Sequence, residues 1–222
     1  MGTWKHTSTY DHTTYTSTDI TQLTLNADGT FIQLRDKVNS NDPDTHDYGA
    51  LKGTYSVDAE GNITISETYY ADNLSSFSIE GADWTPYDHP NEYKGPVLVI
   101  GNQLYTQAFL IAQGLVSGIV GTWGVEGMNK MWDSDANAYD QTYFKYELVF
   151  MNDGTVTRNR YESSTGTFGL PESSTGTYSY SNGTFTMQID SETYTNKVTI
   201  YNNKYLIFGD ETSATANAFI KQ

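Results

Sequence analysis

Gly2-Thr3-Trp4, at the start of the chain, returns as Gly121-Thr122-Trp123, and this pair of tripeptides decides the fold. Further motifs return in the same order. Asp-Gly-Thr occurs at residues 28–30 and 153–155, and Gly-Thr-Tyr-Ser occurs at residues 53–56 and 176–179. Ala-Phe-Leu at 108–110 is matched by Ala-Phe-Ile at 218–220. A repeat of about a hundred residues is the size of a domain rather than of a solenoid repeat. We therefore predict two tandem domains, residues 1–118 and 119–222.

Alternation of apolar and polar residues with a period of two recurs in both halves, whereas a 3.6-residue period is hard to find. The alternating runs flank turn sequences such as Asn-Ala-Asp-Gly at 26–29 and Asn-Asp-Gly at 152–154, which is typical of hairpins. Each half has about eight such strands, counting the Gly-Thr-Trp strand. We predict an all-β protein of two small antiparallel up-and-down barrels. Closed barrels are favoured over sandwiches because closure removes exposed sheet edges.

Some segments of the chain need separate expectations. Residues 104–111 are expected to form one strand, and residues 216–220 to form the last strand of the second half. Three polar or aromatic stretches are expected to be long loops, and loops of this length are usually functional. These stretches are residues 39–50, 68–95 and 124–141.

The composition excludes several classes of function. A net charge of −15 with only 12 Lys and Arg argues against nucleic acid and anionic membranes as partners. The same charge fits a solvated acidic surface, a cationic partner or bound divalent cations. No cysteine is present, so disulfides, thiolate metal sites and a cysteine nucleophile are excluded. No run of 18 apolar residues exists, and we expect no transmembrane segment.

The Gly-Thr-Trp opening followed by a series of hairpins resembles the calycin superfamily, and in particular bacterial lipocalin-like domains. The resemblance rests on Gly-Thr-Trp, Asp-Gly-Thr and Gly-Thr-Tyr in the same order in each half. It implies a small barrel of the kind often found on secreted or lipid-anchored proteins. It also implies that Trp4 and Trp123 close one end of each barrel and are structural. The halves are shorter than typical lipocalins, so a shallower pocket is expected.

The location follows from this resemblance and from the start of the chain. Met1 lies directly before the first strand. We expect an export signal to have preceded this point, and a lipid-anchor cysteine could have preceded it as well. The expected location is extracellular, cell-surface or periplasmic, and a native cytosolic start is the alternative.

The three arginines of the chain are the first candidate ligand-binding residues. Arg35, Arg158 and Arg160 all lie on the strand that follows an Asp-Gly-Thr turn. If Phe31 and Val156 point inward, the alternation of a strand points these arginines inward as well. An inward arginine can hold a carboxylate or sulfate with two hydrogen bonds. The alternatives are an internal partner, such as Glu67 or Glu162, or a strand face in solvent.

Aromatic residues in the expected loops are the second group of candidates. Trp84 and Tyr87 in the first half, and Trp132 in the second, could stack on a sugar or cap an apolar ligand at a barrel mouth. The alternative is an aromatic cluster that plugs the barrel end or a domain interface.

No metal, cofactor or catalytic site is predicted. The acidic run at 133–140 has the opening spacing of a calcium loop, but it lacks the glycine at the sixth position and the glutamate at the twelfth. His6 and His12 lie about 20 Å apart on an extended strand, too far for one ion. No esterase elbow, zinc-protease motif or phosphate loop is present.

These observations predict an exported, non-enzymatic protein that binds a small, partly apolar or anionic ligand in a lipocalin-like barrel. The alternative is a surface interaction or assembly module with filled barrels, which binds a protein or glycan through loops rich in Tyr and Trp. An enzyme on the same scaffold is a weaker third candidate. An open cavity with interior arginines would favour the first, and packed interiors with an exposed aromatic patch would favour the second.

Overall fold

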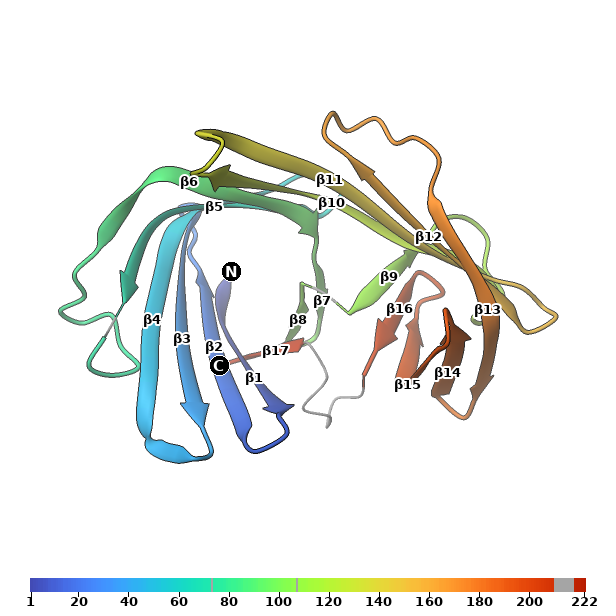
Figure 1. The fold of residues 1–222 in the computed structure, drawn as a ribbon, viewed down its shortest axis with the longest axis horizontal. Helices are drawn as coiled ribbons and strands as arrows, with labels where there is room; N and C mark the ends of the chain where they lie inside the picture. Colours follow the sequence, from blue (N-terminus) through green and yellow to red (C-terminus); the bar gives the residue numbers. More distant parts are fainter. Residues whose placement is uncertain (73, 107, 210–217) are drawn as a thin grey trace. The chain divides into compact units, whose positions relative to one another are not determined.

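The computed structural model describes residues 1–72, 74–106, 108–209 and 218–222. These residues form 17 antiparallel strands and no helix, which confirms the predicted all-β class (Figure 1). The strands fall into two compact units. The first unit comprises Met1–Thr106, Lys130–Asp140 and Asn217–Gln222, and the second comprises Gln107–Asn129 and Gln141–Ala216.

The strands of the first unit close into an antiparallel barrel. Strands β1 to β6 pair in chain order, β7 pairs with β8, and β17 pairs with both β8 and β1. Because β7 follows β6 after one residue, the ring has no free edge. The strands are β1 (Gly2–Asp11), β2 (Thr16–Leu25), β3 (Thr30–Asn39), β4 (Asp42–Val57), β5 (Asn62–Asp72), β6 (Thr85–Pro96), β7 (Leu98–Ile100), β8 (Gln103–Tyr105) and β17 (Ala218–Lys221).

The second unit also closes into a ring, here of eight strands in chain order. Strands β9 to β16 pair successively, and β16 pairs back with β9. This is the up-and-down order that the hairpin series predicts. The strands are β9 (Phe109–Ala112), β10 (Gly121–Asp133), β11 (Ala138–Phe150), β12 (Thr155–Ser163), β13 (Glu172–Ser181), β14 (Thr184–Ile189), β15 (Glu192–Tyr201) and β16 (Tyr205–Phe208).

The closing strands of the two barrels are exchanged along the chain. Strand β9 follows β8 directly, yet it pairs with β10 and β16 of the second unit. Strand β17 comes last in the chain, yet it pairs with β1 and β8 of the first unit. The prediction of one strand over residues 104–111 is therefore wrong. Strand β8 ends at Tyr105 and β9 begins at Phe109, and Ala108 directly before β9 has a φ of 58°. The prediction that residues 216–220 form the last strand of the second half is also wrong, because β17 closes the first barrel. Residues 216 and 217 lie outside the described residues.

Many of the residues that were expected to form three long loops lie in strands instead. Residues 39–50 lie largely in β4, and residues 124–141 form the hairpin of β10 and β11. At the turn of that hairpin, the Asp133 carboxylate accepts hydrogen bonds from the backbone N–H groups of Asp135 and Ala136. Within residues 68–95, residues 74–84 form no strand.

The two units share matched turn geometry. In each Asp-Gly-Thr turn the aspartate accepts from both the N–H and the hydroxyl of the threonine two residues later. A tyrosine then closes the turn: Tyr55 Oη donates to Asn26 O at 2.7 Å, and Tyr178 Oη donates to Met151 O at 2.8 Å. The repeated Asp-Gly-Thr and Gly-Thr-Tyr motifs therefore fold into the same local structure in both units.

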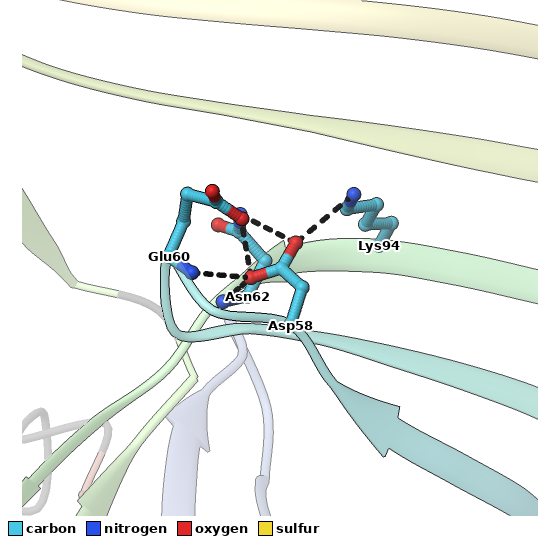
Figure 2. A network of polar contacts seen from close by, with 4 residues as sticks. All are labelled: Asp58, Glu60, Asn62 and Lys94. Carbon is cyan, nitrogen blue, oxygen red and sulfur yellow. Dashed lines mark hydrogen bonds and ion pairs between the residues drawn. The ribbon is translucent and has the colours of Figure 1, made fainter.

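A polar network closes the turn between β4 and β5 (Figure 2). The Asp58 carboxylate accepts from the N–H of Glu60 at 3.1 Å, and from the N–H of Asn62 at 2.8 Å. Lys94 of β6 places its Nζ 3.1 Å from the same carboxylate. The hydrogen bonds from Asn62, aided by the charge of Lys94, lower the pKa of Asp58 well below its usual value.

A candidate ligand-binding cavity

The first unit contains a cavity of about 330 Å³, near the lower end of the usual size of small-molecule sites. Strands β3, β4, β5 and β6 form its wall. Its lining combines two charged residues, one amide and two tyrosines with small and apolar residues. The lining residues are Gln33, Arg35, Gly49, Ala50, Leu51, Tyr70, Asp72 and Tyr87.

Strand register explains why these side chains meet. Phe31 is buried in the core with Trp4 and Leu23, and alternation along β3 puts Gln33 and Arg35 on the same face. Across the sheet, one row pairs Gln33 with Leu51 and Leu51 with Tyr70, while the next row pairs Arg35 with Gly49 and Gly49 with Asp72. The cavity therefore lies on the face that also carries the core.

The aromatic wall of the cavity comes from two different strands. The rings of Tyr70 in β5 and Tyr87 in β6 are tilted against each other with centroids 4.9 Å apart. Burial raises the pKa of Tyr87, and the nearby carboxylates of Glu67 and Asp72 raise it further. The Tyr87 hydroxyl is therefore neutral at physiological pH and can donate a hydrogen bond.

Arg35 brings a positive charge to the cavity. Within residues 1–72, 74–106, 108–209 and 218–222, no ion pair or hydrogen bond of its side chain is seen. Its guanidinium is thus available to an anionic group of a ligand. The sequence left open an internal partner for Arg35, such as Glu67. Neither Glu67 nor any other described carboxylate forms an ion pair with Arg35.

The other two arginines lie in the second unit and do not line this cavity. Arg158 is buried and pairs with Asp190, rather than with Glu67 or Glu162. Arg160 is exposed on the same strand and pairs in register with Glu172. The structure thus brings Arg35 and Tyr87 together, whereas Arg158 and Arg160 belong to a different barrel.

The two candidate tryptophans also lie away from the cavity lining. The Lys52 ammonium lies 4.2 Å from the centroid of the Trp84 ring. Leu51 lines the cavity, and Lys52, the next residue of β4, points to the opposite face of the strand. Trp132 stacks on His89 with centroids 3.5 Å apart, and Tyr139 meets it edge-on. Trp84 therefore lies on the outer face of its barrel, and Trp132 belongs to a separate aromatic cluster.

The interiors of the two barrels differ at matched positions. Gly53 pairs with Glu67, and the register of the second unit puts Ile189 at the corresponding place opposite Gly176. Ile189 is buried among apolar residues, whereas Glu67 is a half-buried carboxyl whose pKa is raised by burial. The second barrel has a larger apolar core and neutralises its interior arginine internally. The first barrel keeps polar groups around open space.

Comparison with known proteins agrees with this architecture. Residues 119–208 match the family model of the lipocalin-like domain. No curated protein and no solved structure matches the chain. Lipocalin-like barrels are generally binding folds, which suggests a binding function. Among the described residues, no helix has the length and apolar character needed to cross a membrane.

Proposed function

We propose that the first barrel of this chain binds a small, partly apolar or anionic ligand in its cavity. The observation that carries the proposal is Arg35, unpaired within the described part of the chain, in the wall of a 330 Å³ cavity beside Tyr87. The guanidinium would hold the anionic group, and the tyrosine rings would cover the apolar part. No group in the cavity is assigned a catalytic role.

The second barrel would then be a structural partner rather than a second binding site. Its Arg158 is paired with Asp190, and its core is filled by large apolar side chains. We attribute the difference to duplication of one lipocalin-like unit, with the halves 1–118 and 119–222 diverging afterwards. The matched turns and tyrosines support this history, and the match to residues 119–208 supports it for the second half. An exported or cell-surface location belongs to the same proposal.

Native mass spectrometry tests the binding function. The purified chain, incubated with a metabolite and lipid extract, is expected to carry an additional mass that denaturation releases. Gly49→Leu should remove that mass, because a leucine here would occupy the cavity and a Cβ at this position meets its neighbours at ordinary distances of 3.7 to 3.9 Å. Arg160→Gln, in the other barrel, should retain it. A chain that stays free of ligand would contradict the proposal, as would equal binding by the Gly49→Leu variant.

One observation favours the second candidate, a surface interaction module. His89, Trp132 and Tyr139 form an aromatic cluster on the first unit, and both His89 and Tyr139 are exposed. Exposed aromatic clusters are common at sites that bind proteins or glycans. The chain would be tested on a glycan array. Binding to a glycan that is lost with Trp132→Ala, and unaffected by Gly49→Leu, would favour this function instead.

A further inference from the structure

Two opposite charges face each other across the cavity without forming an ion pair. Arg35 and Asp72 lie on either side of Gly49 in one row across β3, β4 and β5. A Cβ on Gly49 would lie 3.9 Å from Arg35 Nη2 and 3.8 Å from Asp72 Oδ1. Both charged atoms are therefore within reach of the same small space, which the missing side chain of Gly49 leaves open.

A second carboxyl adds to the acidic side of this interior. Glu67 lies on the same face of β5 as the core, opposite Gly53, and it receives a long hydrogen bond of 3.5 Å from Asn91. Its charge and that of Asp72 both act on the Tyr87 hydroxyl. A ligand with only negative charge would meet the carboxylate of Asp72 beside the guanidinium of Arg35. A ligand with only positive charge would meet the guanidinium of Arg35.

We propose that the ligand is a small zwitterion, such as a free amino acid, with its carboxylate on Arg35 and its ammonium on Asp72. This inference rests on the proposed binding function and names the chemical class of its ligand. The short distance from both charged atoms to one point matches an ammonium and a carboxylate only a few bonds apart. The tilted rings of Tyr70 and Tyr87 would accept an apolar or aromatic side chain of the ligand.

The test compares ligands that differ by one charge. An equimolar mixture of the twenty protein amino acids is first screened against the whole chain by native mass spectrometry. Calorimetry then compares L-phenylalanine with 3-phenylpropionate, which lacks the ammonium, and with 2-phenylethylamine, which lacks the carboxylate. We expect the zwitterion to bind about tenfold or more tightly than either analogue, because each lost charge-assisted hydrogen bond costs at least that factor.

Two variants assign the charges. Arg35→Gln should reduce L-phenylalanine binding to the level of the amine, and Asp72→Asn should reduce it to the level of the acid. Both positions are exposed, so neither change should impair folding, and Arg160→Gln serves as the matched control.

The outcomes separate this inference from the proposed function. If 3-phenylpropionate binds as tightly as the amino acid and Asp72→Asn has no effect, the zwitterion inference is overturned while the barrel remains a binding site. If no amino acid binds, yet an extract ligand is lost with Gly49→Leu, the inference is again overturned. If neither amino acids nor extract ligands bind, the proposed function fails with it.

Discussion

Gly53 and Gly176 occupy matched positions where two strands approach unusually closely. A Cβ on Gly53 would lie 1.9 Å from the carbonyl oxygen of Ser66, and one on Gly176 would lie 2.0 Å from that of Gln188. Backbone atoms cannot move aside as a flexible side chain can. We predict that Gly53→Ala and Gly176→Ala each lower the free energy of unfolding by about 2–3 kcal/mol, measured by urea unfolding.

Gly95→Ala is the control for both glycine variants, since nothing lies within 4 Å of a Cβ at that position. Its effect should stay within about 0.5 kcal/mol. If Gly53→Ala were as well tolerated as the control, the inference that β4 approaches β5 too closely for a side chain at this position would be wrong.

Asp58 makes part of the stability of the first unit dependent on pH. Its pKa is lowered in the folded chain, first by hydrogen bonds from Asn62 and then by Lys94. A lowered pKa means that the carboxylate stabilises the fold above its ordinary pKa of 3.8 and that this contribution is lost as the pH falls below that value. Asp58→Asn, which keeps the shape and removes the charge, should therefore be less stable than the natural chain at neutral pH. The difference should shrink in acid, and a difference that stays constant in urea unfolding from pH 7 to pH 2 would argue against the network.

At the scale of residues, the sequence could predict one side of the cavity and not the other. Counting from Phe31 correctly puts Arg35 on the core face of β3. The same count along β5, from buried Ile63, would put Asp72 on the outer face. A register shift between Glu67 and Tyr69 reverses the alternation and turns Asp72 inward. No local sequence signal marks this bulge, so half of the charged pair was missed.

At the scale of elements, the exchange of closing strands makes an unusual prediction. Ile220 of β17 pairs with Lys5 and Gln103, and Ile111 of β9 pairs with Gly124 and Tyr205. Proline within a strand removes an N–H donor and disturbs pairing on both sides. Ile220→Pro should speed hydrogen exchange in β1 and β8, and Ile111→Pro should speed it in β10 and β16. Hydrogen-exchange mass spectrometry would contradict the exchange if each variant affected the barrel of its own half.

The hairpins with strong turn signals were predictable, whereas polar strands were not. Asn-Ala-Asp-Gly and Asn-Asp-Gly mark turns that need positive φ, and the structure has turns at both sites. The first six residues of β4 are all exposed, and β10 and β11 carry many exposed residues near their shared turn. Such strands are held by backbone pairing, so they need no alternation of apolar residues. The exchange of β9 and β17 could not be predicted either, because their sequences are nearly alike and do not show which barrel each strand joins.

At the scale of the whole molecule, two barrels of similar topology have different interiors. The second has the larger apolar core and a paired interior arginine. The first keeps an open cavity with an unpaired guanidinium among its described residues. We therefore propose that the first barrel binds the ligand and that the second is structural, so ligand should affect the first barrel only.

The chain offers a direct test of this division, because it has only three arginines. Their side-chain Nε–Hε signals in a ¹⁵N-correlated NMR spectrum report separately on the cavity, on the Arg158–Asp190 pair and on the exposed surface of the second unit. Arginine-to-lysine variants assign the three signals. On addition of the metabolite extract, we predict that the signal of Arg35 shifts while those of Arg158 and Arg160 stay in place. A shift of Arg158 or Arg160 instead, or no shift of any arginine, would contradict the assignment of ligand binding to the first barrel.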